Sequence, residues 1–77
     1  MTLRRELFWD IGAERIPEVL EQSPGWVIVR VFQYGELEEI AEIISKYGRE
    51  KVREVLLTEK LQPMAKAMAY YFMDLDL

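Results

Sequence analysis

The stretch GWVIVRVFQYG, residues 25–35, decides how the fold of this sequence is interpreted. Its β-branched and aromatic residues favour a β-strand by intrinsic propensity. However, the stretch runs between Ser23-Pro24, a typical helix start, and Gly35, a typical helix end. No second clear strand is available to pair with it, and a lone strand leaves its backbone polar groups unsatisfied. We therefore predict a helix here; the alternative is a strand that pairs across a dimer.

Glycine and proline divide the rest of the chain into further short helical segments. Before the central stretch, we predict a first helix that Thr2 caps and that ends at Asp10-Ile11-Gly12. A very short helix, PEVLEQ, follows with Pro17 in its first turn. Ser23 is then expected to cap the helix that begins at Pro24.

Beyond Gly35, apolar residues at helical spacing predict three more helices. In the first of these, one apolar face is formed by Leu37, Ile40, Ile44 and Tyr47. The second of these helices is expected to bury Val52, Val55 and Leu56. The sequence LTEKLQ that follows is predicted to be a turn. Pro63 opens the last helix, whose apolar face is formed by Met64, Ala67, Met68 and Tyr71. The sequence therefore predicts a single all-α domain, residues 1–77, built as a compact bundle of five or six short helices.

The composition argues against an enzyme. The 77 residues include no histidine and no cysteine, which removes the usual general base and the commonest metal ligands. The four glycines are far apart and form no phosphate-binding loop. The acidic run Glu36-Leu37-Glu38-Glu39 fits a helix N-terminus better than a metal cluster. We therefore expect no catalytic activity, no cofactor and no metal site.

The sequence also indicates where the protein works. No apolar run approaches the roughly 20 residues that span a bilayer. The N-terminus MTLRRELFWD has no small-residue cleavage site and does not resemble a signal peptide. We expect a soluble cytoplasmic protein that makes no contact with a membrane.

The charge balance disfavours nucleic acid as the partner. The net charge is −4, whereas strong non-specific binding to DNA needs a positive surface. The alternative is a DNA-binding regulator that uses residues 49–66, in which the pair of helices from 49 to 73 forms a helix-turn-helix and Arg49, Arg53 and Lys60 contact the DNA. Its second helix, QPMAKAMAYYF, offers little beyond Gln62 and Lys66 to read base edges.

A protein partner is the favoured class. Apolar residues make up 51% of a small chain, so some of them are expected to lie at the surface. The last helix carries Tyr70 and Met73 on the same side as Lys66, away from its main apolar face, and aromatic and methionine side chains suit interfaces. These three residues are the candidate surface for another protein or for self-association. The alternative is that they lie over the edge of the core.

Four pieces of the chain, in this order and spacing, resemble a small bacterial family of unknown function. They are LFWD at 7–10, IVRVFQYG at 28–35, KYGREKVREVL at 46–56, and a leucine followed by the aromatic YYF within 61–72. The resemblance implies the antitoxin-like small partner of a toxin–antitoxin gene pair, often beside a nucleotidyltransferase-type toxin. The chain departs from the family pattern in the last helix, where Tyr70-Tyr71 stands where a tryptophan is often found.

Arg30 is the one charge within the central stretch, and the resemblance implies what surrounds it. The resemblance groups Arg30 with Trp9, Asp10, Tyr34 and Gly35. On a helix, Trp26 and Tyr34 flank Arg30 at i−4 and i+4, so a ring of either can stack on its guanidinium group. Asp10 is the best candidate for a bidentate carboxylate partner. We predict a partly buried structural ion pair between Arg30 and Asp10; the alternative is that Arg30 contacts a partner.

Together these observations favour a non-enzymatic, antitoxin-like protein-interaction module whose apolar C-terminal face covers a toxin. A DNA-binding regulator that uses residues 49–66 and a structural homo-oligomer are the two alternatives.

Overall fold

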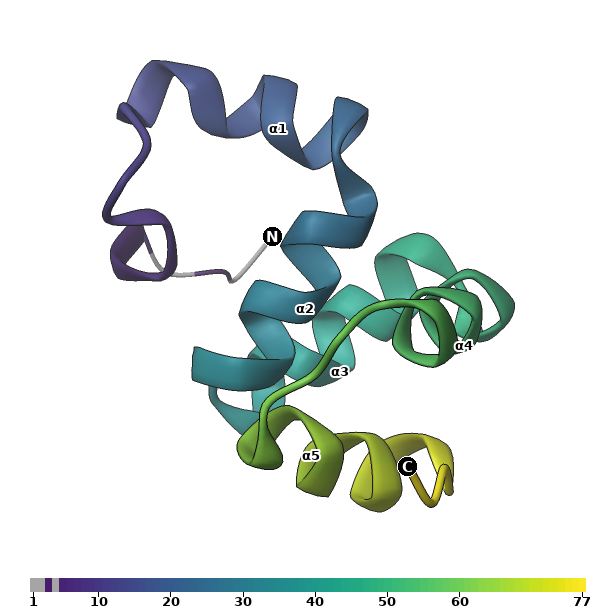
Figure 1. Ribbon diagram of the computed structural model, residues 1–77. Helices are drawn as coiled ribbons and strands as arrows, with labels where there is room; N and C mark the ends of the chain where they lie inside the picture. The colour runs from purple at the N-terminus through teal and green to yellow at the C-terminus, as the bar shows by residue number, and fades with distance from the viewer. Residues whose placement is uncertain (1–2, 4) are drawn as a thin grey trace.

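Helices account for every regular element of the structure. This computed structural model describes Leu3 and residues 5–77, apart from the side chains of residues 5 and 13. In chain order, the elements are the 3₁₀-helices η1 (Arg5–Phe8) and η2 (Ala13–Arg15) and the α-helices α1 (Ile16–Gln22), α2 (Pro24–Tyr34), α3 (Leu37–Tyr47), α4 (Arg49–Thr58) and α5 (Pro63–Met73) (Figure 1). The described residues contain no β-strand, so the all-α prediction is confirmed. None of the helices in this part of the chain is long and apolar enough to cross a membrane.

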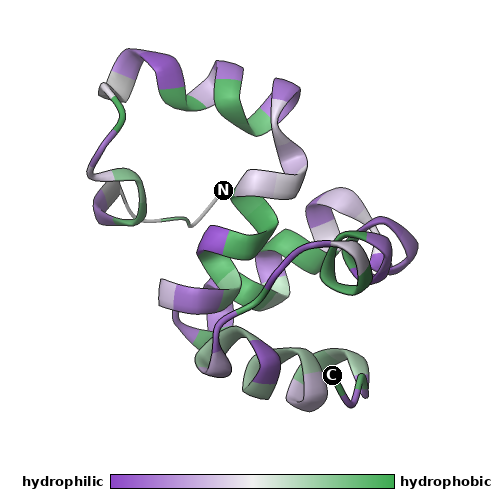
Figure 2. Cartoon of the chain, viewed as in Figure 1, coloured by the Kyte–Doolittle hydropathy of each residue, from purple (hydrophilic) through white to green (hydrophobic). Residues whose placement is uncertain are grey.

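Helix α2 is the centre of the fold. Four of its residues, Val27, Ile28, Val31 and Phe32, have no exposed surface. The other four α-helices all contact α2, and Figure 1 shows α1 above it, α4 beside it and α5 below it. In Figure 2 the hydrophobic colour gathers on α2 and α3 in the middle of the molecule. The free energy gained by burying α2 on several sides is larger than the small difference between helix and strand propensity. The β-branched stretch therefore forms the predicted helix, and the alternative prediction of a strand that pairs across a dimer is wrong.

Both ends of α2 fall where the sequence predicts, but their chemistry differs. The Ser23 hydroxyl makes no capping hydrogen bond; the backbone N–H of Ser23 instead donates to the carbonyl of Val19 in α1. One residue therefore ends α1 and begins α2. Gly35 ends α2 in an extended conformation. Space requires a glycine there, because a Cβ atom would lie 2.6 Å from the Val31 carbonyl oxygen.

The N-terminal segment is less regular than predicted. Instead of one helix that ends at residues 10–12, the chain forms η1, and η2 then leads directly into α1. Thr2, the predicted cap, lies outside the described residues. Leu7 and Phe8 in η1 are buried, and η1 contacts α2. This contact brings the residues that follow η1 to the surface of α2.

The buried side of α3 is rotated from the predicted one. Ile40 and Ile43 have no exposed surface, whereas Leu37 of the predicted face is 52% exposed. The rotation brings Glu39 onto the buried side, where a capping box accommodates it. The backbone N–H of Glu36 donates to Glu39 Oε1 at 2.7 Å, and the Glu36 side chain accepts from the backbone of Glu39. These reciprocal bonds provide acceptors for the backbone N–H groups of Glu36 and Glu39 at the start of the helix. The buried carboxylate of Glu39 is therefore hydrogen-bonded to the backbone.

A side-chain hydrogen bond ties α3 to α1. The Tyr47 hydroxyl donates to the carbonyl oxygen of Leu20. Burial raises the pKa of Tyr47 above its ordinary value of 10.0. The hydroxyl therefore keeps its proton, and the bond persists, at any pH near neutrality.

Helix α4 agrees closely with the prediction. Its inward residues are the predicted Val52, Val55 and Leu56. The helix continues to Thr58, two residues into the segment predicted as a turn. Residues 59–62 then form the linker, and α5 begins at Pro63 as predicted.

Helix α5 turns a different side inward from the one predicted. Ala65, Ala69 and Met73 are buried, whereas Met64 and Tyr71 of the predicted face are 59% and 69% exposed. The two alanines let the backbone of α5 approach the core closely, and the bulkier side chains stay outside. Because apolar residues occupy both sides of α5, the helical period alone does not identify the inner side.

Candidate functional site

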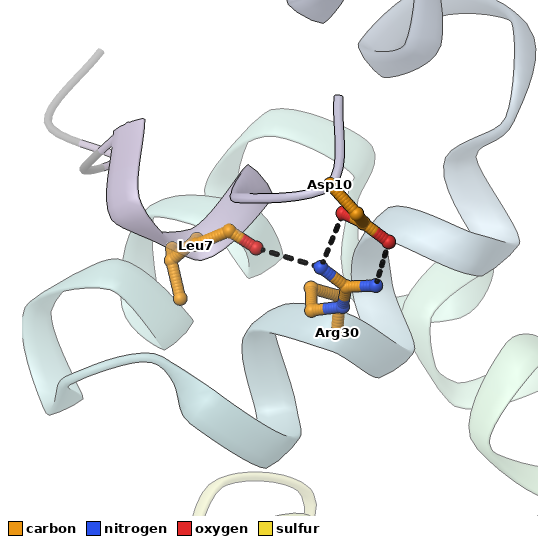
Figure 3. Close-up of polar contacts among 3 residues, drawn as sticks. All are labelled: Leu7, Asp10 and Arg30. Atoms are coloured by element: carbon orange, nitrogen blue, oxygen red, sulfur yellow. Dashed lines mark hydrogen bonds and ion pairs between the residues drawn. The ribbon is translucent and has the colours of Figure 1, made fainter. Parts of the chain in front are cut away.

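The guanidinium group of Arg30 is held by the segment around η1. Its Nη1 donates to the carbonyl oxygen of Leu7 at 2.9 Å and to Asp10 Oδ1 at 3.1 Å, and its Nη2 donates to Asp10 Oδ2 at 3.0 Å. Figure 3 shows the carboxylate facing the guanidinium edge and the Leu7 carbonyl approaching from the side. The structure thus contains the bidentate pair between Asp10 and Arg30 that the sequence predicts.

Two tryptophan rings pack against the same guanidinium group. The Arg30 Cζ atom lies 4.3 Å from the ring centroids of both Trp9 and Trp26. Trp26 precedes Arg30 by one turn of α2, as expected for a stacking neighbour, whereas Trp9 comes from the segment after η1. Tyr34 packs on the ring of Trp9 edge to face, with centroids 5.4 Å apart and an interplanar angle of 83°. The cluster therefore joins the N-terminal segment to α2 through charge and ring contacts together.

Burial is uneven within the pair. The Arg30 side chain is 13% exposed, whereas that of Asp10 is 48% exposed. The hydrogen bonds from Arg30 lower the pKa of Asp10 below its ordinary value of 3.8. The pair is therefore charged at neutral pH, with its cation inside the cluster and its anion at the surface.

The cluster forms one wall of a shallow pocket, which we call the aromatic pocket. Its volume is about 280 Å³, and it is lined by Trp9, Trp26, Val29, Arg30, Gln33, Tyr34 and Glu59. Glu59 is the C-cap residue of α4, so the pocket lies between α2 and the end of α4. This volume falls just below the roughly 300–1,000 Å³ of typical small-molecule sites. The pocket therefore suits one side chain better than a whole cofactor.

The candidate partner residues of α5 are not all on one surface. Lys66 and Tyr70 are exposed, and Tyr70 retains 62% of its surface. Met73 is 6% exposed, so its prediction as a surface residue is wrong. It follows Ala65 and Ala69 at intervals of four, and this spacing places it on the side that packs inward.

The candidate DNA contacts Arg49, Arg53 and Lys60 are all exposed. They lie on α4 and the linker, where acidic side chains accompany them. Lys51 forms an ion pair with Glu54 at 3.8 Å on the same helix. The exposed side of α4 is therefore a surface of mixed charge rather than a basic stripe.

The acidic run at 36–39 has a structural role. Glu36 and Glu39 form the capping box described above, and Glu39 is 2% exposed, so this residue does not belong to a solvated face. Across the residues that the structure describes, no three histidine, cysteine or acidic side chains gather closely enough to hold a metal ion.

Two features of this surface have no counterpart in the sequence prediction. One is Glu59 in the aromatic pocket. The other is a groove of about 350 Å³ near the C-terminus, lined by Leu56, Leu57, Glu59, Lys60, Leu61, Lys66 and Leu77. Both depend on how the end of α4 and the linker meet other helices. Helical periodicity carries no signal for such contacts, because they join residues outside any single helix face.

No curated protein and no solved structure matches this chain significantly. The sequence model of one family matches residues 3–56, a range from the N-terminal segment to Leu56 in α4. The aromatic C-terminal helix, one of the four pieces of the family resemblance, lies beyond this range. Because the match covers most of the chain, the protein belongs to a family of unknown function (DUF6922).

Proposed function

We propose that the protein is a non-enzymatic, antitoxin-like interaction module that binds a protein partner through its C-terminal surface. This surface comprises Leu57, Lys60, Met64, Lys66, Tyr70, Tyr71 and Leu77, all of them exposed. The proposal that this partner is a toxin rests on the family resemblance. The non-enzymatic role is supported by a sequence without histidine or cysteine.

The outward side of α5 carries the proposal. Its exposed residues are Pro63, Met64, Lys66, Ala67, Tyr70 and Tyr71, so one charge accompanies five residues with apolar or aromatic side chains. A surface helix normally turns charged and polar residues outward, and a helix that is apolar on several sides is normally buried. Tyrosine and methionine are enriched at interfaces. The outward side of α5 is therefore composed like a surface that another molecule covers.

The groove beside α5 indicates the chemistry of the partner. Its apolar floor includes Leu57 and Leu77, which are 51% and 42% exposed. Lys60 and Lys66 line the same groove, and neither forms an ion pair with the side chains that the structure describes. An apolar segment flanked by carboxylates complements this arrangement.

Co-expression with the product of the neighbouring gene tests the proposal. We expect a stable complex by size-exclusion chromatography with light scattering, and calorimetry to show that Tyr70→Ser and Lys66→Glu each weaken it more than tenfold. Leu37→Ser is the control, because Leu37 is also an exposed apolar residue, at 52% against 62% for Tyr70, and lies on α3. A complex that tolerates both C-terminal variants as well as it tolerates the control contradicts the proposal.

The two alternative functions give different results. A homo-oligomer forms without any partner, and Tyr70→Ser dissociates it. A DNA-binding regulator binds its own promoter with a dissociation constant of roughly 10⁻⁸ M or tighter near physiological salt. Arg49→Ala and Arg53→Ala then abolish that binding while the protein complex is unaffected.

A further inference from the structure

We propose that the aromatic pocket binds an arginine side chain presented by a protein partner. The pocket lies between α2 and the end of α4, and it shares only Glu59 with the C-terminal groove. The proposal therefore does not depend on the function proposed for the C-terminal surface.

The charge of Arg30 is already neutralised within the protein. Both Nη atoms donate to the carboxylate of Asp10, and Nη1 also donates to the Leu7 carbonyl. Asp10 thus occupies the guanidinium edge that could otherwise donate two parallel hydrogen bonds to a carboxylate ligand. This argues against an acidic ligand, which would have to displace Asp10.

The remaining charge in the pocket is negative. Glu59 forms no ion pair with any side chain that the structure describes. The faces of the indole and phenol rings in the lining carry negative electrostatic potential as well. A pocket with aromatic walls and a carboxylate that pairs with none of the described side chains therefore attracts a cation.

The shape of the pocket favours arginine over lysine. Trp9 and Trp26 remain 63% and 38% exposed although they pack on Arg30, so ring surface is available to a ligand. A planar guanidinium group stacks on an aromatic face and pairs with a carboxylate through two parallel hydrogen bonds. An ammonium group is a compact, strongly hydrated charge and gains less from either contact. The volume of about 280 Å³ is in scale with one side chain.

Intrinsic fluorescence provides a direct measurement, because the chain has two tryptophans and both line the pocket. The probe is a blocked Gly-Arg-Gly peptide, with Gly-citrulline-Gly as its neutral analogue and Gly-Lys-Gly as the alternative cation. We expect a saturable change in tryptophan emission with the arginine peptide, a weaker response to lysine and none to citrulline. Raising the salt concentration should weaken the response.

Charge variants assign the response to this pocket. Glu59→Gln should weaken binding of the arginine peptide about fivefold, the equivalent of about 1 kcal/mol for an exposed ion pair. Glu54→Gln is the matched control, since it removes the same charge from α4, five residues before Glu59 and outside the pocket. Equal responses to arginine and citrulline, a lysine response as strong as that of arginine, or unchanged binding in Glu59→Gln overturns the proposal. Saturable binding of a Gly-Glu-Gly peptide instead would show that Arg30 recognises an anion, and this also overturns it.

Discussion

The Arg30 cluster and the outward side of α5 both expose aromatic rings, but the rings differ in what they contact. Trp9 and Trp26 pack on a guanidinium group that the protein itself supplies, and Tyr34 packs on Trp9. On α5, the ring of Tyr71 contacts that of its chain neighbour Phe72. Among the described residues, no ring on the outward side of α5 packs on a charged side chain. The two regions therefore differ in the contacts that their exposed rings make within the chain, and not in exposure alone.

The two regions also differ in their relation to the family. The Arg30 cluster lies inside the matched range of residues 3–56, whereas α5 lies outside it. We propose that the cluster stabilises the fold and that α5 contributes to the C-terminal surface that binds a partner. Substitutions that break the Arg30–Asp10 pair should then change stability, and substitutions on α5 should change binding at the C-terminal surface.

Arg30→Met should have the largest effect on stability. Methionine fills the space of the side chain but removes the hydrogen bond to Leu7, the charge contact with Asp10 and the attraction of two rings. We expect a loss of about 2 kcal/mol, less than for a fully buried pair, because the Asp10 carboxylate returns to water. Urea unfolding followed by circular dichroism measures it. Arg53→Met, on the exposed side of α4, is the control. Equal urea midpoints for the two variants would mean that the contacts of Arg30 do not stabilise the fold.

Arg30→Lys should have a smaller effect of the same sign. Lysine keeps the positive charge, but it cannot donate two parallel bonds to Asp10 or stack as a planar group. We expect a loss of about 1 kcal/mol in the same unfolding measurement, intermediate between wild type and Arg30→Met. Wild-type stability in Arg30→Lys would show that charge alone, without geometry, holds the cluster.

Asp10→Asn should destabilise less than either Arg30 variant, because Asp10 is half exposed and the amide still accepts one hydrogen bond. Its effect should depend on pH. The hydrogen bonds from Arg30 lower the folded-state pKa of Asp10 below 3.8. The stabilisation is therefore complete above the unfolded-state pKa and is lost as the pH falls through the lower, folded-state value.

The difference in stability between wild type and Asp10→Asn should accordingly shrink as the pH falls below about 3.8. Thermal unfolding at a series of pH values measures this difference, with Glu54→Gln as the control. A double variant with Arg30→Met should cost less than the sum of the two single variants. Additive losses would mean that the two residues act independently in spite of their contact.

Much of the fold could be predicted from the sequence because helix starts and stops are chemically explicit. Ser23-Pro24, Gly35 and Pro63 all mark observed boundaries. The inner side of a helix could be predicted where one side is clearly apolar, as in α4. It could not be predicted for α5, because both sides are apolar and the choice depends on which residues are small enough to pack closely.

The candidate site was predictable in part for a similar reason. The need to neutralise a charge inside an apolar stretch predicts a partner for Arg30, and the family resemblance indicated Asp10 as that partner. Helical spacing identified Trp26 as a stacking neighbour. The carbonyl of Leu7 and the carboxylate of Glu59 could not be found this way, because their places depend on the path of irregular segments across α2.

The double variant Tyr70→Ser/Tyr71→Ser should have the smallest effect on stability of all these changes. Tyr70 and Tyr71 are 62% and 69% exposed, and removing exposed side chains that hold no buried group usually changes the unfolding free energy by less than about 0.5 kcal/mol. The double variant should therefore unfold at the wild-type urea concentration while losing the partner complex. The opposite pattern is expected of Arg30→Met, which should unfold at lower urea concentration yet bind the partner of the C-terminal surface normally where it remains folded. A large loss of stability in the tyrosine variant would mean that these rings cover the core of the isolated chain, and α5 would then belong to the scaffold rather than to the docking surface.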